Sequence, residues 1–312
     1  MKIVFHFDAS PLLAERAAAL CAPFELACCP ESSDLRFASE IGTADVLWHS
    51  LKPVTHPVIA GAPKLKLIQK IGVGVNTIDL EAAKARGIAV CNLPGANSRA
   101  VAEMALLLML ACLRRLRELD AAVRTSGGWH AANELQDKFG ELGGRTVGLV
   151  GMGSIPQQLA AWLTGMGVRV VYSSRNRRDC PYEHLPLPEL LAGADIVSLH
   201  VPLTDETRGL IGAATLAAMK PGAILINTAR GALVDETALL AALTSGRLGG
   251  AGLDVFAEEP PSPAHQLLAL PNVVASPHLA WLTQETWERS LKIAVENCRR
   301  LEAGEALLNR VA

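Results

Sequence analysis

The sequence lacks the features that mark several large classes of protein. Its 312 residues carry a formal net charge of only −2, which gives no electrostatic reason to expect a nucleic-acid partner or an anionic membrane partner. The longest apolar run, residues 104–113, has about half the length of a membrane span and predicts a buried helix. The first ten residues contain too few apolar side chains for a signal peptide. Internal repeats and low-complexity segments are also missing.

Cysteine is present, but not in a pattern that forms a framework. The number of cysteines is odd and no Cys-x-x-Cys occurs, so the sequence predicts neither a disulfide scaffold nor a zinc site. Thiols without partners suit a reducing compartment, and we therefore expect a cytoplasmic protein with no bound metal. The seven cysteines are Cys21, Cys28, Cys29, Cys91, Cys112, Cys180 and Cys298.

The chain instead contains short apolar runs that alternate with helical patterns. Half of the residues are hydrophobic, and a chain of 312 residues predicts two domains. Strands alternating with helices are typical of parallel sheets covered on both faces, which is an α/β fold. The expected strands are residues 3–7, 46–48, 67–71, 89–91, 146–150, 168–172, 196–199, 224–227, 252–255 and 273–275.

Residues 145–178 have the pattern strand, glycine turn, helix, strand, which is the first unit of a dinucleotide-binding fold. In the turn GMGSIP, Gly151 permits a sharp bend and Gly153 lets the backbone approach a pyrophosphate. Ser154 is the expected N-cap of the following helix, whose free N–H groups favour phosphate. Pro156 stands where the pattern G-x-G-x-x-G has its third glycine, and this departure leaves the local phosphate geometry open.

The end of the second strand of this unit bears on the choice of cofactor. An NAD site usually places an acidic residue there, which binds the ribose hydroxyls. This sequence has Ser173, Ser174 and Arg175, with Arg177 and Arg178 just beyond and no carboxylate before Asp179. A guanidinium pairs with a 2′-phosphate, so we expect NADP(H), with NAD(H) still possible. The alternative is that these arginines form an ordinary solvated loop.

Three residues in the second half of the chain form a set with catalytic potential: Arg230 in NTARG, Glu259 in DVFAEEP and His278 in SPHLAW. Each taken alone has an ordinary structural explanation. Taken together, Arg230 would bind a substrate carboxylate and polarise the adjacent carbonyl. His278 would exchange the hydroxyl proton, and Glu259 would hold its imidazole and raise the imidazole pKa. Hydride would then pass between a nicotinamide and C2 of the substrate.

A second glycine-containing segment, KIGVGVNTID, lies in the first half of the chain. Isolated glycines in an apolar context suggest a close approach of the backbone to another group. We expect the N–H groups of Val73 and Gly74 to bind a substrate carboxylate, although a simple turn is an equally good interpretation of this segment alone.

Seven segments in this order resemble the D-isomer-specific 2-hydroxyacid dehydrogenase family over nearly the whole chain: GVGVNTID, NSRAVAE, GLVGMGSI, HVPLTDETRGLI, INTARGALVDE, GLDVFAEEP and SPHLAW. The resemblance implies two doubly wound parallel-sheet domains with the active site in the cleft between them. A flavodoxin-like substrate domain would comprise residues 1–97 and 282–312, and a Rossmann domain residues 98–281. It also implies a homodimer built largely on the helix after Ser98.

The resemblance further implies a role for individual residues. The catalytic residues would be Arg230, Glu259 and His278. Substrate would be bound by Leu51, Val73, Gly74, Arg230, His278 and Trp281. The cofactor would be bound by Met152, Gly153, Ser154, Ile155, Ser173, Ser174, Arg175, Arg178, His200, Pro202, Thr207, Thr228, Ala229 and Asp254. For Trp281, three interpretations stay open: a wall of the substrate pocket, a contact across the dimer, or an ordinary buried aromatic residue.

The function expected from this sequence is NADPH-dependent reduction of a small 2-oxoacid to the D-2-hydroxyacid, as in glyoxylate and hydroxypyruvate reductases. The loop HSLKP, which contains Leu51, has no arginine but only Lys52, so a phosphorylated substrate is disfavoured. The nearest alternative is the same reaction with NADH and a bulkier 2-oxoacid. A non-catalytic, corepressor-like cofactor sensor is a third hypothesis, and the complete set of Arg230, Glu259 and His278 argues against it.

Overall fold

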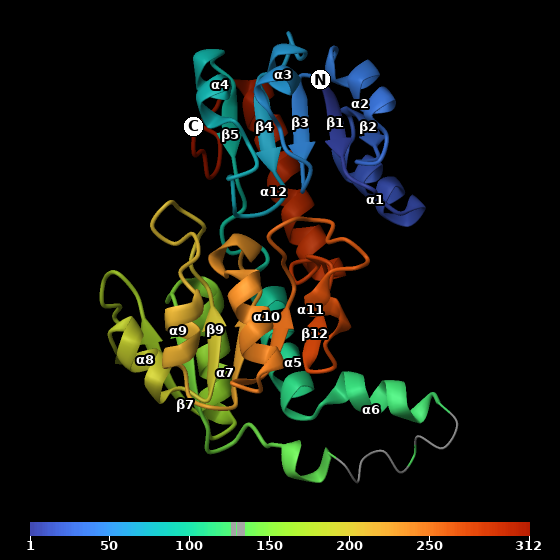
Figure 1. Cartoon of the computed structure of the whole chain (residues 1–312). Coiled ribbons are helices and arrows are strands. Elements are labelled where there is room, and N and C mark those ends of the chain that lie inside the picture. Colours follow the sequence, from blue (N-terminus) through green and yellow to red (C-terminus); the bar gives the residue numbers. More distant parts are fainter. Residues whose placement is uncertain (126–128, 130–134) are drawn as a thin grey trace. The chain divides into compact units, whose positions relative to one another are not determined.

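The computed structural model describes residues 1–125, 129 and 135–312, and the chain divides into two compact units (Figure 1). Unit 1 comprises Met1–Asn97 and Leu282–Ala312, and unit 2 comprises Ser98–Trp281. Each unit contains one parallel sheet with helices, so the predicted α/β fold class with two parallel sheets is confirmed.

The sheet of unit 1 has the strand order β2-β1-β3-β4-β5, which is the flavodoxin-like order. The chain order reverses between β1 and β3, and ligands of such sheets bind at the carboxyl ends of the strands at this switch point. The strands are β1 (Lys2–His6), β2 (Glu25–Cys29), β3 (Val46–His49), β4 (Leu67–Lys70) and β5 (Ala89–Cys91). The helices are α1 (Pro11–Cys21), α2 (Asp34–Ile41), α3 (His56–Ala60), α4 (Leu80–Ala85) and α12 (Gln284–Ala303).

The register of this sheet places polar side chains in a row at its carboxyl edge. Val4 pairs with Leu47, and Leu47 pairs with Ile68, and these side chains belong to one buried core cluster. Because alternate residues of a strand share a face, His6, His49 and Lys70 follow on the same face two residues further along. Their pairing is equally in register, His6 with His49 and His49 with Lys70.

The sheet of unit 2 has the order β12-β11-β10-β9-β6-β7-β8. Read from β8, these strands follow the Rossmann order, with one further strand added at the far edge. The switch point lies between β6 and β9. The strands are β6 (Thr146–Val150), β7 (Arg169–Ser173), β8 (Glu183–His184), β9 (Ile196–Leu199), β10 (Ala223–Asn227), β11 (Leu248–Leu253) and β12 (Val273–Ala275). The helices are α5 (Ser98–Leu113), α6 (Leu116–Val123), α7 (Ser154–Gly165), α8 (Leu187–Gly193), α9 (Ala213–Ala218), α10 (Glu236–Thr244), α11 (Gln266–Ala269) and the short 3-10 helix η2 (Gly231–Leu233).

The apolar helix expected after Ser98 is α5, which packs against α7 and against β10 and β11. The approach to the sheet is close, because a Cβ on Gly252 of β11 would lie 2.8 Å from Cβ of Leu108. The helix ends at Leu113, where the apolar run of residues 104–113 also ends, and Arg115 just beyond it adopts a left-handed conformation with φ 50°. In the described part of the chain, no helix combines the length and the apolarity that crossing a membrane requires.

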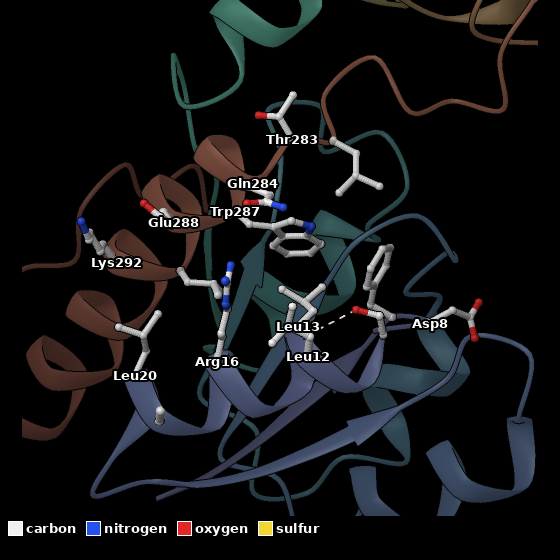
Figure 2. A pocket seen from close by; sticks show the side chains of 15 residues that line it. Asp8, Leu12, Leu13, Arg16, Leu20, Thr283, Gln284, Trp287, Glu288 and Lys292 are labelled. Carbon is white, nitrogen blue, oxygen red and sulfur yellow. Dashed lines mark hydrogen bonds between the residues drawn. The ribbon is translucent and has the colours of Figure 1, made fainter.

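Unit 1 also contains a groove of about 860 Å³ along α1 and the first turns of α12 (Figure 2). Its lining is mainly apolar, including Leu12, Leu13, Leu20 and Trp287. None of the site residues predicted from the sequence lines this groove.

Candidate functional site

The glycine turn of unit 2 lies at the switch point of its sheet. Gly151 follows β6 with φ 103°, and a Cβ there would lie 2.6 Å from the carbonyl oxygen of His200, so only glycine fits. His200 follows the neighbouring strand β9, and its N–H donates to the carbonyl of Val150 at 2.7 Å. The predicted cofactor-binding residues Met152, Gly153, Ser154 and Ile155 form the turn and the start of α7. The turn therefore has the position and the backbone geometry of a dinucleotide-binding loop.

The prediction that Ser154 caps this helix is wrong. Gly153 is the N-cap, and Ser154 is the first helical residue, with its Oγ 2.8 Å from Oγ of Ser98. Pro156 lies in the first turn, where the helix has no backbone acceptor for its N–H groups, so its missing N–H costs no hydrogen bond. The first helical bond runs from N–H of Gln157 to the carbonyl of Gly153 at 3.1 Å. The departure at Pro156 thus leaves the N–H groups of this turn available to an anion.

The side chains of Tyr172 and His184 hold the backbone of the loop after β7. The N–H of Arg178 donates to the hydroxyl of Tyr172 at 2.8 Å, and a ring nitrogen of His184 lies 3.0 Å from the carbonyl of Ser174. The side chain of Arg175 is 83% exposed, with Nη1 3.9 Å from a carboxylate oxygen of Glu206. The backbone is therefore fixed while the guanidinium next to the expected ribose position faces solvent, with one carboxylate nearby.

Polar residues predicted to bind the cofactor follow β9 and β10. His200 Nε2 lies 2.9 Å from Oγ of Ser198, and burial lowers the pKa of His200 to about 4, so its imidazole is neutral at pH 7. Pro202 accepts from the hydroxyl of Thr207 at 2.7 Å. Thr228 Oγ1 is buried with no hydrogen-bond partner in the described part of the chain. Since buried hydroxyls are normally paired, the Thr228 hydroxyl fits a site that a bound cofactor completes.

His278 and Glu259 are in direct contact. His278 Nδ1 lies 2.6 Å from Glu259 Oε2, and the N–H of Phe256 donates to Glu259 Oε1 at 3.0 Å. Burial alone would raise the pKa of Glu259, but the hydrogen bond and charge of His278, the Phe256 N–H and the charge of Arg230 lower it on balance. An ionised carboxylate accepts from Nδ1–H, which leaves Nε2 of His278 for proton exchange.

Asp254, predicted to bind the cofactor, organises the histidine loop. Its carboxylate accepts from the hydroxyl of Ser276 at 2.5 Å and from the N–H groups of Leu279 and Ala280 at 3.0 and 2.9 Å. Its carbonyl accepts from the N–H of His278 at 2.7 Å. His278 has φ 56°, which is uncommon for a residue with a side chain. Surrounding structure must impose this conformation, and Asp254 supplies much of that constraint.

Trp281 closes the same loop from its other end. The side chain is 7% exposed, and Nε1 donates to the carbonyl of His278 at 3.1 Å. This hydrogen bond makes Trp281 a support of the histidine loop, and the other interpretations of Trp281 stay predictions.

Arg230 lies in the segment after β10, and its backbone is fixed on both sides. Asn227 Nδ2 donates to the carbonyl of Arg230 at 2.9 Å, and Arg230 Nη1 donates to the carbonyl of Ala229 at 2.6 Å. Burial lowers the pKa of Arg230, and the charge of Glu259 opposes this shift. The guanidinium therefore remains charged close to Glu259.

Sequence reasoning missed Gly231, which follows Arg230 directly. A Cβ at this position would lie only 1.9 Å from the carbonyl carbon of Phe256, so the backbone of the Arg230 segment touches the backbone that leads to Glu259. The available signal was a glycine directly after an arginine at the end of a strand. Asn227 was also missed, and its side chain holds both Ala229 and Arg230.

The predicted substrate-binding residues of unit 1 lie in the loops after β3 and β4. The N–H of Leu51 donates to Oε1 of Glu31 at 2.9 Å. Val73 is 41% exposed, and its carbonyl accepts from Asn92 Nδ2 at 2.8 Å. Within the described residues, the N–H groups of Val73 and Gly74 have no acceptor. These two N–H groups are therefore available to an anionic ligand.

The residues that the structure describes contain no group of three or more His, Cys, Asp or Glu side chains able to hold a metal ion.

Comparison with known proteins agrees with this architecture. Residues 106–280 match the model of the family described as "D-isomer specific 2-hydroxyacid dehydrogenase, NAD binding domain". The chain is 43% identical over 269 residues to a glyoxylate reductase of Thermococcus litoralis, covering 83% of this chain and 80% of that protein. It is 41% identical over 244 residues to a hydroxypyruvate reductase of Thermotoga maritima, covering 77% and 78%. A crystal structure of a protein from Thermus thermophilus superimposes with a TM-score of 0.90 at 40% identity, covering 100% of both chains. The chain therefore belongs to the D-isomer specific 2-hydroxyacid dehydrogenase family and is an NAD(P)-dependent oxidoreductase.

Proposed function

We propose that this enzyme reduces a small 2-oxoacid, such as glyoxylate or hydroxypyruvate, to the D-2-hydroxyacid with NADPH. The observation that carries the proposal is the 2.6 Å contact between His278 Nδ1 and Glu259 Oε2, with Arg230 electrostatically coupled to the same carboxylate. The names of the glyoxylate reductase and hydroxypyruvate reductase relatives support this class of substrate.

Each residue has a distinct task in this reaction. A bound reduced nicotinamide supplies the hydride. Arg230 binds the substrate carboxylate and polarises the carbonyl at C2. Protonated His278 donates its Nε2 proton to the oxygen that becomes the hydroxyl, and Glu259 stabilises the imidazolium before the transfer. The alcohol product therefore gains its two hydrogens from different donors, a hydride at carbon and a proton at oxygen.

The proposal assigns substrate binding to both units. The N–H groups of Val73 and Gly74 bind the carboxylate from unit 1, and Leu51 contacts the substrate's remaining atoms. Unit 2 supplies Arg230, Glu259 and His278 and also holds the cofactor.

The preference for NADPH rests on the end of β7. Ser173, Ser174 and Arg175 stand where a carboxylate would otherwise bind the ribose hydroxyls and repel a phosphate. The exposed Arg175 guanidinium is a suitable partner for a 2′-phosphate. Glu206 near Arg175 is the one observation that favours the alternative, NADH with a bulkier 2-oxoacid, because its charge would repel the phosphate.

A substrate panel with both cofactors tests the proposal. Purified protein is mixed with NADPH or NADH and with glyoxylate, hydroxypyruvate or phenylpyruvate, and the loss of reduced-nicotinamide absorbance is followed. We expect the highest kcat/KM with NADPH and one of the two small substrates. A preference for NADH and phenylpyruvate would support the alternative. Cofactor binding without turnover of any 2-oxoacid would support the sensor hypothesis.

We also propose a homodimer built on α5 and α6. These helices expose Leu107, Leu116 and Val123 at 53%, 52% and 58% of their surface, which is unusual for a set of apolar side chains on adjacent helices. Light scattering of the wild type and of Leu107→Glu measures the mass in solution. A monomeric mass for the wild type would contradict the proposal.

A further inference from the structure

Lys70, the last residue of β4, is a buried lysine at the carboxyl edge of the sheet of unit 1. Its exposed fraction is 5%. Burying an ammonium group is unfavourable unless hydrogen bonds replace its lost hydration. An apolar side chain of similar length would fill the same space at a lower cost. The presence of a charged residue here therefore needs an explanation beyond packing.

The ammonium of Lys70 reaches groups from two different loops. Nζ donates to the carbonyl oxygen of Ser50, lies 3.3 Å from Nε2 of His49 and lies 3.5 Å from Oγ1 of Thr77. Ser50 begins the loop after β3, directly before Leu51. Thr77 lies in the loop after β4, beyond Gly74. Lys70 thus connects the two segments of unit 1 that carry the proposed substrate-binding residues.

The rest of the side chain lies against the second of these loops. A Cβ on Gly72 would lie 3.4 Å from Cε of Lys70, so the lysine stem lies close to the side of Gly72 that a side chain would occupy. His49 Nε2 lies 2.9 Å from Oγ1 of Thr77, which joins the same two loops a second time. Burial, Lys70 and His6 lower the pKa of His49, so this imidazole is neutral and can accept a hydrogen bond.

We propose that Lys70 is a positioning residue for substrate binding, which holds the loop of Leu51 in a fixed relation to the N–H groups of Val73 and Gly74. The inference rests on the proposed function, since those loops are assigned to the substrate there. The loop after β3 also begins at the switch point of the sheet, where a flavodoxin-like fold binds its ligands. A shift of this loop would change the substrate's fit without touching the cofactor turn, which belongs to unit 2.

The test compares Lys70→Met, Lys70→Arg and Lys66→Met in the full-length enzyme. Lys66 directly precedes the same strand, and its exposed side chain lies 3.6 Å from a carboxylate oxygen of Asp45, so it controls for the loss of a lysine charge. We expect Lys70→Met to lower kcat/KM for the 2-oxoacid roughly ten- to hundredfold, mainly through KM, because misplaced binding groups have effects of this size. The Kd for NADPH should stay at its wild-type value. Lys70→Arg should recover part of the loss, and Lys66→Met should match the wild type.

A wild-type KM in a folded Lys70→Met variant would overturn the inference, as would equal losses in Lys70→Met and Lys66→Met. A change in Tm alone, with all kinetic constants intact, would assign Lys70 a structural role only. If the wild type reduces no 2-oxoacid, the proposed function is wrong. The role of Lys70 in fixing the two loops can then still be tested by hydrogen exchange. Lys70→Met should then exchange the amides of Leu51 and Lys52, which both donate to Glu31, faster than Lys66→Met does, and equal exchange would overturn the inference. If Lys70→Met does not fold, Lys70→Arg is measured in the same way.

Discussion

Glu259 joins the imidazole of His278 to the backbone at Phe256, because its two carboxylate oxygens accept from Nδ1 of His278 at 2.6 Å and from the N–H of Phe256 at 3.0 Å. A second pair of the same residue types lies beside this segment, where His265 Nε2 is 3.1 Å from Glu236 Oε2 and Glu236 Oε1 accepts from the N–H of Ala257 at 2.8 Å. The molecule therefore contains its own control for the loss of a histidine–glutamate contact.

Removing the proposed proton donor should abolish most turnover. His278→Ala should lower kcat about 100-fold or more, the usual effect of a lost general acid. Glu259→Gln should also lower kcat, because an amide stabilises the imidazolium less well than a carboxylate does. Steady-state rates with saturating cofactor measure both effects, with Glu236→Gln as the matched control. An unchanged rate in His278→Ala would place the proton donor elsewhere.

Arg175 should determine affinity for the 2′-phosphate. Arg175→Ala should weaken NADPH binding about tenfold or more, since hydrogen bonds to charged groups have this strength, and should leave NADH binding unchanged. Glu206→Gln removes the nearby carboxylate and should strengthen NADPH binding a few-fold. Fluorescence titration of the wild type and each variant with both cofactors gives the dissociation constants. Arg177→Ala serves as the control for loss of an exposed charge in the same loop, and equal losses in the two arginine variants would refute the phosphate argument.

Gly231 should tolerate no side chain. Gly231→Ala forces a Cβ into the backbone of Phe256 and should cost about 3 kcal/mol or more of the free energy of unfolding. Gly165→Ala is the matched control, because Gly165 belongs to α7 and a Cβ there meets nothing within 4 Å. Denaturant titration of both variants gives the two free energies. A Gly231→Ala variant as stable as Gly165→Ala would mean that the Phe256 backbone moves freely away.

His6 should make the protein sensitive to acid. Burial and the charge of Lys52 lower the pKa of His6 from 6.5 to about 4, and its ring stacks on Phe37 with centroids 3.8 Å apart. Between these two pH values the unfolded chain binds the proton and the folded chain does not. Stability therefore falls as pH decreases from 6.5 to 4, by up to about 3 kcal/mol from this residue.

The variant His6→Phe keeps an aromatic ring against Phe37 but cannot titrate. Its free energy of unfolding should decline less than that of the wild type over the same pH interval. His56→Gln, at an exposed position, is the control. Parallel pH profiles for the wild type and His6→Phe would show that His6 contributes nothing to the acid sensitivity.

The sequence alone was informative wherever a short buried strand is bounded by turn residues. The strands at residues 89–91, 146–150, 196–199 and 273–275 have the expected bounds, because a continuous apolar run is encoded locally. The expected strand at 252–255 instead runs over Leu248–Leu253, since Gly249 and Gly250 interrupt the apolar signal near its start. Strand β2 was missed because it is an edge strand whose residues are mostly only half-buried, and β8 because it has only two residues.

The residues of the candidate site divide in the same way. Arg230, Glu259 and His278 were identified from their positions near the ends of predicted strands, and that signal is local. The roles of Gly231 and Lys70 could not be predicted from the sequence. The role of Gly231 depends on the Phe256 backbone that lies opposite it, and the role of Lys70 depends on the two loops that its side chain joins. Pattern in the sequence determined the two α/β units and the residue types near their carboxyl edges. Only the tertiary structure decided which of these groups touch, because contacts between residues far apart in the chain are set by packing.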